Sequence, residues 1–161
     1  THLTPLERQR VFDLLQKHQN MCDGRLGHVH STSHWIELVP GAKPVHCQPY
    51  RAGTRARELE STEIQRMLKT GVIYPATSEW ASPIVLVPKP DGSMRFCVDY
   101  RRLNAITTRD SYPLPRMDEC IDSFGDATVF STLDCNAGYW QIPVDPVDRP
   151  KTMFTSHEGL F

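Results

Sequence analysis

A turn near residue 134 carries the residues best suited to chemistry. Val129 and Phe130 lead through Ser-Thr-Leu to a single carboxylate, Asp134, and small residues and two aromatics then follow as far as Ile142. A carboxylate at the end of a strand, before an uncrowded turn, can hold a hard cation such as Mg²⁺ and let a phosphate approach backbone amides. The same pattern also fits an ordinary turn in which the Asp bonds its own backbone. The motif alone leaves both interpretations open.

Two cations lie on a predicted β-hairpin. Pro90-Asp-Gly-Ser93 has the composition of a tight turn between apolar strands at residues 85–87 and 94–100. Lys89 then lies near the tip on one arm and Arg95 on the other. Arg offers a planar fork and Lys a point charge, a usual combination for phosphate groups. A solvated strand face is the alternative, because most Lys and Arg side chains are simply exposed.

Local charge points in the same direction. The formal net charge of −1 gives no argument for nucleic-acid or membrane binding, so any such surface must be local. A basic stretch interleaved with Tyr100 and Tyr112 suits a nucleic-acid backbone with some stacking, and a mixed-charge surface is the alternative. Its six basic residues face three acidic ones: Lys89, Arg95, Arg101, Arg102, Arg109 and Arg116 against Asp91, Asp99 and Asp110.

Length and composition predict one folded domain. The 161 residues are 39% hydrophobic and 23% charged, and thirteen prolines favour extended connections. Five widely spaced Cys without a CxxC pair indicate a reducing compartment. His28-Val-His30 is the only close pair among the His and Cys of residues 22–47, which argues against a zinc site. No apolar run is long enough for a membrane span, and no signal segment opens the chain.

Helix and strand signals alternate along the chain. Thr4 and Glu7 form a capping box for a helix that runs to about His18 or Asn20, and residues 21–53 form an extended, partly stranded linker. A second helix covers about 55–70, ended by Gly71 in a left-handed cap that Val72 closes.

The C-terminal part mixes loops, one helix and short strands. A loop is predicted over residues 104–115, a third helix from Pro115 to Gly125, and strands at 129–133, 141–144 and 152–155. A turn at 145–149 separates the last two. The chain is therefore expected to have an α+β fold.

Several of these segments, in their order, resemble one known family. The motifs include Ser78–Val87, Lys89–Arg101, Leu103-Asn104, Tyr112–Pro115, Phe130–Asp134, Gly138–Ile142 and Lys151–Phe154. From about residue 30 onward the chain is similar to the N-terminal half of a reverse transcriptase, of the type found in gypsy-type LTR retrotransposon polyproteins. His34–Leu38 and Gln48–Arg51 also resemble the lead-in of that family.

The resemblance implies a right-hand polymerase fold. Residues 1–53 would form an N-terminal helix and lead-in, and residues 54–161 the fingers and the start of the palm. The domain would then be truncated before the Asp-Asp hairpin that completes the catalytic site, since no Asp-Asp pair occurs in the sequence.

The resemblance also implies roles for the turn after residue 130. Asp134 would be catalytic and bind two Mg²⁺ ions, with Mn²⁺ as an alternative, and the Cys135 carbonyl would be a further metal ligand. The amides of Ala137 and Gly138 would contact the incoming dNTP. Tyr139 would stack under its deoxyribose.

Further implied roles lie on the hairpin. Lys89 and Arg95 would hold the triphosphate, and Asp99 and Arg101 would contact the template. Implied partners are an RNA or DNA template-primer, dNTPs and the rest of the polyprotein, namely palm, thumb, RNase H and integrase. The expected location is the cytoplasm, within virus-like particles, or the nucleus after import, without a membrane association.

The function expected is therefore that of an RNA-directed DNA polymerase fragment. The parent reaction is attack of a primer 3′-OH on the α-phosphate of a dNTP. Two metals need several carboxylates, and Asp134 is one, so we expect the isolated chain to be inactive. Two alternatives stay open: a nucleic-acid-binding remnant without chemistry, and a relic that has no function as an isolated chain.

Overall fold

The computed structural model describes residues 3–21 and 23–161, and these form two compact units. Unit 1 combines Thr1–Ser33 with Met117–Pro143, and unit 2 combines His34–Arg116 with Val144–Phe161. Cys22 lies outside the described residues. The domain boundary predicted at residue 53 stays a prediction.

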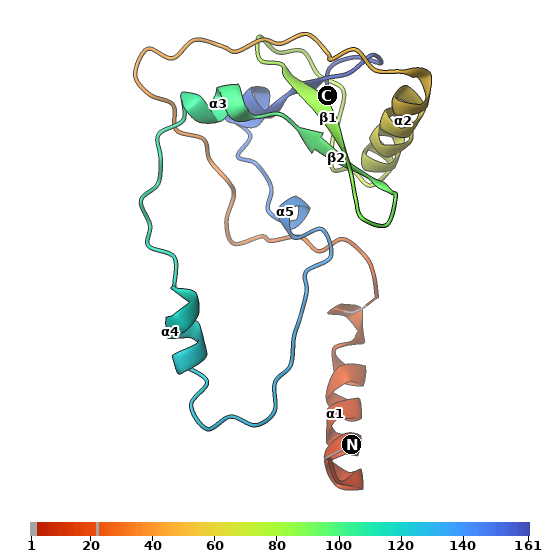
Figure 1. Cartoon of the computed structure of the whole chain (residues 1–161), viewed down its shortest axis with the longest axis vertical. Coiled ribbons are helices and arrows are strands. Elements are labelled where there is room, and N and C mark those ends of the chain that lie inside the picture. Colours follow the sequence, from red (N-terminus) through yellow and green to blue (C-terminus); the bar gives the residue numbers. More distant parts are fainter. Residues whose placement is uncertain (1–2, 22) are drawn as a thin grey trace. The chain divides into compact units, whose positions relative to one another are not determined.

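Unit 2 is built on a three-stranded sheet of order β2-β1-β3 (Figure 1). Strand β1 (Ser82–Pro88) pairs antiparallel with β2 (Met94–Val98), which confirms the predicted hairpin. Strand β3 (Phe154–Thr155) pairs parallel to the start of β1, with Ser82 opposite Phe154. The sheet is therefore mixed and short, as an α+β fold allows.

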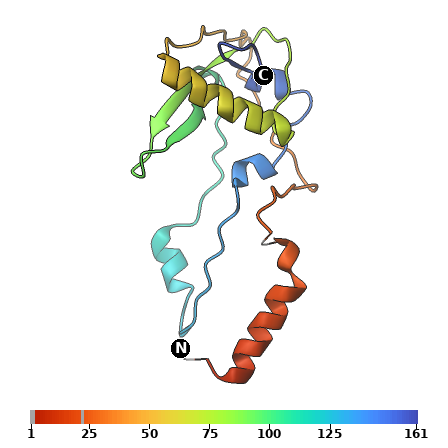
Figure 2. The ribbon, with the colours of Figure 1, turned by 90° about the vertical axis from the view of Figure 1, so that its right-hand side faces the viewer.

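Helix α2 (Thr54–Lys69) packs on the sheet and ends as predicted (Figure 2). Gly71 has φ +71°, a left-handed conformation that costs a glycine little. The Gly71 amide donates to the Leu68 carbonyl and the Val72 amide to the Met67 carbonyl, at 3.1 and 3.0 Å. This pair of bonds is a Schellman motif, and it satisfies carbonyls that the helix end would otherwise leave unpaired.

The core of unit 2 forms between this helix and the sheet. Ile64 is fully buried, and Met67 lies one turn further along the same face of α2. Phe154 makes edge contact with the Phe96 ring and stacks on the Phe161 ring, with ring centres 5.6 and 5.8 Å apart. The other buried apolar residues are Ile36, Ala81, Ile84, Leu103 and Met153.

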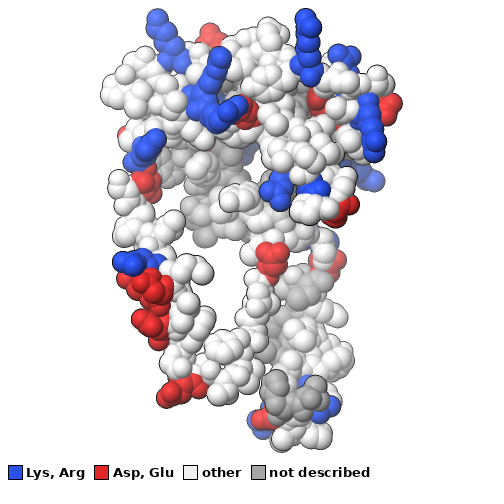
Figure 3. Space-filling model, in the orientation of Figure 1, with Lys and Arg blue, Asp and Glu red and all other residues white. Residues whose placement is uncertain are grey.

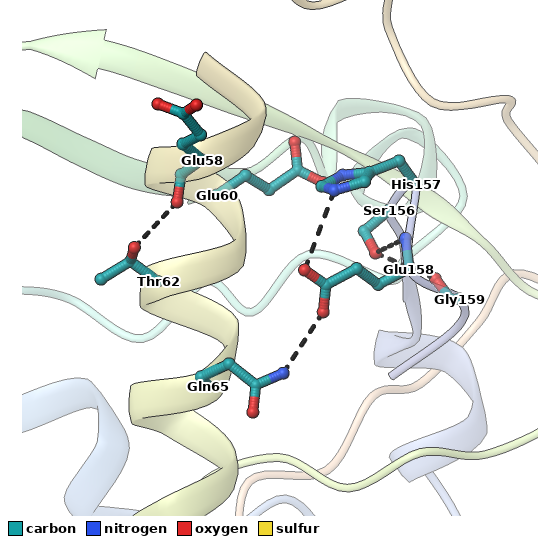
Figure 4. Close-up of polar contacts among 8 residues, drawn as sticks. All are labelled: Glu58, Glu60, Thr62, Gln65, Ser156, His157, Glu158 and Gly159. Carbon is teal, nitrogen blue, oxygen red and sulfur yellow. Dashed lines mark hydrogen bonds and ion pairs between the residues drawn. The ribbon is translucent and has the colours of Figure 1, made fainter. Parts of the chain in front are cut away.

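Polar contacts fasten residues 154–161 to α2 (Figure 4). Phe154 and Phe161 exchange two backbone hydrogen bonds, which closes a small hairpin with His157 and Glu158 near its tip. The His157 ring lies 3.1 Å from the Glu60 carboxylate, and Gln65 donates to Glu158 at 3.4 Å. The C-terminal hairpin is thus attached to the helix by polar side-chain contacts.

The lead-in segment joins unit 2 through isolated bridges rather than a full strand. His34 bridges Val144, Leu38 bridges Thr107, and His46 bridges Ala81. The linker predicted over residues 21–53 is confirmed for residues 23–53, which are extended and partly paired, whereas Met21 belongs to a 3₁₀ turn. Ile36, in this segment, is buried in the core of unit 2.

A buried ion pair holds that lead-in in place. Asp148 accepts a hydrogen bond from the Ile36 amide at 2.7 Å and pairs with the Lys151 ammonium. Lys151 in turn donates to the Ile36 carbonyl at 2.8 Å. Burial alone would raise the pKa of Asp148, but the bonds from Lys151 and the Ile36 amide outweigh it, and the pKa lies below its usual value.

Unit 1 begins with helix α1 (Pro5–Lys17), which forms as predicted. Thr4 and Glu7 make a reciprocal capping box: the Glu7 amide donates to the Thr4 hydroxyl oxygen and the Thr4 amide to the Glu7 carboxylate. The Thr4 hydroxyl also donates to the Glu7 carboxylate at 2.7 Å, and this bond, together with the one from the Thr4 amide, lowers the pKa of Glu7. A short 3₁₀ turn, η1 (Gln19–Met21), follows.

The rest of unit 1 differs from prediction. The third helix, α4 (Met117–Asp122), is shorter than expected, although Gly125 follows it with φ +51°. The predicted strand at 129–133 is wrong: these residues run as a plain extended connection in Figure 1. A strand needs a partner for its backbone groups, and among the described residues none pairs with this segment.

The strand predicted at 141–144 is also wrong. Helix α5 (Gly138–Gln141) occupies its first residue, and Val144 forms only the bridge to His34. Two short helices were not predicted. Helix α3 (Arg101–Ala105) takes the start of the predicted loop, and the 3₁₀ helix η2 (Arg149–Thr152) takes the first residue of the strand predicted at 152–155, which is observed as β3. Within the described residues, no helix has the length and apolar character that a membrane span needs.

Candidate functional site

The hairpin of unit 2 presents its two cations on one face. Val87 pairs with Arg95, and the Lys89 amide donates to the Ser93 carbonyl at 2.8 Å, so the pairing continues into the turn. Side chains alternate along a strand, which places Lys89 diagonal to Arg95 on the same side. Both are exposed. The hairpin can therefore offer two positive charges to one anion.

The turn between these cations is held by Asp91. Its carboxylate accepts from the Ser93 amide at 2.9 Å and from the Ser93 hydroxyl at 2.6 Å. These hydrogen bonds, with a smaller contribution from the charge of Lys89, lower the pKa of Asp91. Asp91 is thus occupied with the turn, and its role in the structure is local.

Asp99 and Arg101 form a bidentate ion pair. Arg101 Nε and Nη2 donate to the two oxygens of Asp99 at 2.8 and 2.7 Å, and the Tyr50 hydroxyl adds a bond at 3.2 Å. The hydrogen bonds from Arg101 hold the pKa of Asp99 well below its usual range, and the same pair raises the pKa of Arg101. The Asp99 side chain is 10% exposed and that of Arg101 83%. Asp99 therefore orients an arginine that faces solvent.

Beside this pair the surface is hollowed. An open pocket of about 460 Å³ is lined by Arg101, Asn104, Ala105, Thr107, Thr108 and Arg109. Lys and Arg side chains are scattered over the surface around α2, α3 and the hairpin, with Asp and Glu among them (Figure 3). Guanidinium, amide and hydroxyl groups are the usual partners of phosphates, so this pocket suits a nucleic-acid backbone.

The two tyrosines of the basic stretch differ. The Tyr100 hydroxyl donates to the Thr152 carbonyl at 2.6 Å, and burial raises its pKa to about 12. Tyr112 is 77% exposed. Tyr100 is therefore a packing residue, and Tyr112 is the one whose ring is open to a base.

The turn around Asp134 lies in unit 1 and is exposed. Within the described residues, the Asp134 side chain makes no hydrogen bond or ion pair, so the alternative of a self-bonded turn does not hold. Ala137 adopts a left-handed conformation, φ +48°, and its carbonyl accepts from the Trp140 amide at 2.8 Å. Gly138 then opens α5, and Tyr139 is 96% exposed.

The predicted site residues are thus divided between the units. Unit 2 brings Lys89 close to Arg95 and pairs Asp99 with Arg101. Unit 1 holds the consecutive group Asp134, Cys135, Ala137, Gly138 and Tyr139.

A metal site is not complete in these residues. Among residues 3–21 and 23–161, no group of three His, Cys, Asp or Glu side chains could hold a metal ion. One carboxylate cannot supply two divalent ions with the oxygen ligands that they need. The described residues therefore do not fit a two-metal centre by themselves.

Sequence patterns missed Tyr50 and the pocket. Tyr50 lies 49 positions before Asp99, so no local spacing indicates their hydrogen bond. Helix α3, which lines the pocket, has five residues, too few for a helical period to be read. Tyr50 and Arg101 could have been found only through the family motifs that contain them, Gln48–Arg51 and Lys89–Arg101.

Known proteins are similar to this chain over the predicted site residues of both units. Residues 87–160 match the family model "Reverse transcriptase (RNA-dependent DNA polymerase)". The Pol polyprotein of the Drosophila melanogaster transposon opus is 36% identical over 73% of this chain and 12% of its own length. The enzymatic polyprotein of cauliflower mosaic virus (strain Strasbourg) is 30% identical over 99% of this chain and 24% of its own.

Solved structures agree with the family match. The crystal structure of a prototype foamy virus protease–reverse transcriptase superposes with a TM-score of 0.75 at 25% identity, over 99% of this chain and 22% of that one. A foamy viral protease–reverse transcriptase in complex with an RNA/DNA hybrid gives a TM-score of 0.76 at 25% identity, again over 99% of this chain and 22% of that one. The chain spans about a tenth to a quarter of the curated relatives it matches. Residues 87–160 of this chain therefore belong to the reverse transcriptase (RNA-dependent DNA polymerase) family.

Proposed function

We propose that this chain supplies the nucleotide-binding and template-binding part of an RNA-directed DNA polymerase from a retroelement polyprotein. The observation that carries the proposal is that one family match, residues 87–160, includes the cationic hairpin, the Asp99–Arg101 pair and the Asp134 turn. The reaction is template-directed addition of a dNTP to a primer 3′-OH. A gypsy-type LTR retrotransposon is the proposed origin.

Each unit, taken by itself, carries residues that would bind the nucleotide. Lys89 and Arg95 would neutralise the triphosphate, because two cations on one hairpin face can share one polyanion. The amides of Ala137 and Gly138 would contact the phosphates, and the exposed Tyr139 ring would stack on the deoxyribose. The left-handed Ala137 supports this role, because strained backbone is concentrated at binding sites.

Asp134 is proposed as one carboxylate of a Mg²⁺ site, with the Cys135 carbonyl as a further ligand. Any such site needs more carboxylates from outside the described residues, so no catalytic step is assigned to this chain alone. The exposed, unpaired state of Asp134 supports a role as a ligand, because a carboxylate without internal partners is available to a cation.

The template would lie along the Asp99–Arg101 pair and its pocket. Two foamy virus structures hold dsDNA and an RNA/DNA hybrid, and their likeness to this chain supports such a partner here. The remaining polymerase subdomains, RNase H and integrase are proposed partners from the same polyprotein, with the cytoplasm, virus-like particles or the nucleus as the location.

The first experiment measures binding of an RNA/DNA hybrid with a single-stranded template overhang to the purified chain. Fluorescence anisotropy between about 25 and 200 mM salt is expected to show affinity falling steeply, because phosphate contacts release counterions. Arg101→Ala should reduce the slope of log affinity against log salt by about one. Arg10→Ala, in α1, is the matched control and should leave the slope unchanged. Absence of binding at the lowest salt would reject the template role.

The second experiment separates chemistry from binding. The purified chain with template-primer, dNTPs and Mg²⁺ is expected to add no nucleotide, because it has one of the several carboxylates required. Extension that Asp134→Asn abolishes would overturn this inactivity and would support the polymerase assignment directly. Hybrid binding without extension fits both the polymerase fragment and the alternative of a binding remnant, so dNTP binding must separate those two.

A further inference from the structure

One short segment of unit 1 contacts both ends of the turn formed by residues 136–141. The Asn136 side-chain amide donates to the Gly24 carbonyl at 2.9 Å. The Val29 amide donates to the Gln141 carbonyl at 2.7 Å. Residues 24–29, which we name the strap, therefore bracket residues 136–141 with two hydrogen bonds. The strap precedes the matched residues 87–160, so the family match says nothing of it.

The middle of the strap fits closely against the same turn. A Cβ added at Gly27 would lie 2.9 Å from Gln141 Oε1 and 3.0 Å from its Cδ. The Gln141 side chain is not free to give way at no cost, because its Nε2 donates to the Asn136 carbonyl at 2.9 Å. Gly27 thus permits a contact that ties the two ends of the turn to each other.

The turn needs such support because its backbone is strained. Ala137 is left-handed, which a residue with a Cβ rarely adopts and which the surroundings must enforce. A Cβ on Gly138 would lie 3.3 Å from the Cβ of Cys135, so the adjacent backbone is close as well. Hydrogen bonds from Asn136 and Gln141, on either side of Ala137, are placed to hold this conformation.

We propose that the strap and its partners Asn136 and Gln141 are a positioning device for the Ala137–Tyr139 turn. They keep the amides of Ala137 and Gly138 and the ring of Tyr139 in one arrangement before a nucleotide arrives. Preorganisation of this kind strengthens binding by removing the cost of ordering the loop. The nucleotide role of the turn rests on the function proposed above, whereas the positioning contacts stand on the geometry of unit 1.

The positioning role is tested first without any ligand. Asn136→Asp removes the donor and sets a carboxylate oxygen against the Gly24 carbonyl. Hydrogen exchange followed by NMR should then be about tenfold faster at the amides of Val29 and Trp140, both bonded in this motif. Asn20→Ala, elsewhere in unit 1, is the control and should change neither. Unchanged exchange at both amides in Asn136→Asp would overturn the positioning role.

A double-mutant cycle tests the contact between Gly27 and Gln141. Gly27→Ala and Gln141→Ala each disturb the bond from Gln141 to the Asn136 carbonyl, so their effects on exchange at Trp140 should not add. The double variant should exchange about as fast as the stronger single variant. Full additivity would show that the two residues act separately, against the proposal.

Nucleotide binding then links the device to function. In calorimetry, Asn136→Asp should raise the Kd for dTTP about fivefold. The Kd for the RNA/DNA hybrid should stay unchanged. General unfolding would weaken the binding of both ligands. Failure of the unaltered chain to bind dTTP would count against the proposed function of the turn and leave the exchange result to decide the strap. An equal loss for dTTP and hybrid would overturn selective positioning.

Discussion

Both units contain many apolar residues, but they differ in how far those side chains are buried. In unit 2, α2 and the sheet bury a continuous set of residues around Ile64, Phe154 and Phe161. In unit 1, none of the described residues is buried, and apolar side chains on α1, α4 and the connection before Asp134 lie open to solvent. They include Leu6, Phe12, Leu15, Ile121, Phe130 and Leu133.

The difference shows that a segment can be ordered by local hydrogen bonds without the stability that a buried core contributes. Unit 1 has a capping box, a left-handed residue and the bracketing bonds of the strap, all of which depend on neighbours in sequence or on single hydrogen bonds. Unit 2 adds burial, which contributes about 25 cal/mol for each Å² of apolar surface removed from water. The proposed cation and template residues therefore lie on a packed scaffold, and Asp134 lies on one without a core of its own.

The largest expected effect comes from the core of unit 2. Ile64→Ala should lower the free energy of unfolding of unit 2 by about 2–5 kcal/mol, because it removes a fully buried side chain and leaves a cavity. Urea denaturation followed by far-ultraviolet circular dichroism measures it. Leu59→Ala, on the same helix but 40% exposed, is the matched control and should cost far less. Equal costs would show that the described core does not form in solution.

The next effect concerns the buried pair of unit 2. Asp148→Ala should cost about 1–3 kcal/mol, because it leaves the Ile36 amide and the Lys151 ammonium without their shared acceptor. The same urea experiment measures this loss. Glu79→Ala, at an exposed position of the same unit, serves as a control for general disturbance, and the Asp148 prediction fails if both variants lose the same stability.

The pH dependence follows from the sign of the Asp148 shift. Its pKa is lowered in the folded chain, so its contribution is complete above the ordinary Asp pKa of about 3.9 and is lost as the pH falls below that value. The unaltered chain should therefore lose stability between about pH 4 and pH 2 more steeply than Asp148→Asn. Parallel curves for the two proteins would contradict the lowered pKa.

The predictions made from the sequence succeed where the contacts are local and fail where they join distant residues. The capping box of α1, the Schellman end of α2 and the Asp91 turn of the hairpin are confirmed, because each is set by residues within a few positions of one another. These elements needed no knowledge of the rest of the chain.

The failures need partners distant in sequence. Residues 129–133 have the composition of a strand, but a strand forms only where another backbone accepts its hydrogen bonds. The Tyr50–Asp99 bond and the strap join residues 49 and 112 positions apart, which no local pattern encodes. The roles of Asp134, Lys89 and Arg95 came from the resemblance, and they remain predictions.

A smaller and local effect is expected in unit 1. Thr4→Ala should cost α1 about 1 kcal/mol of helix stability, because it removes the acceptor for the Glu7 amide. Circular dichroism should report less helix, while the urea midpoint of unit 2 stays in place. Thr4→Ser keeps the hydroxyl and should restore the helix signal. A shift of the unit 2 midpoint in Thr4→Ala would show that the stability of the units is coupled.

The smallest effect should come from the connection before Asp134. Leu133 is 89% exposed, so Leu133→Asn should change the free energy of unfolding by less than about 0.5 kcal/mol and should raise solubility by removing exposed apolar surface. Leu103→Asn, which places the same amide at a position only 4% exposed in unit 2, should be strongly destabilising. If Leu133→Asn proved as costly as Leu103→Asn, the segment before Asp134 would have to be packed in solution, and the contrast between the two units would fail at the residue next to the proposed metal ligand.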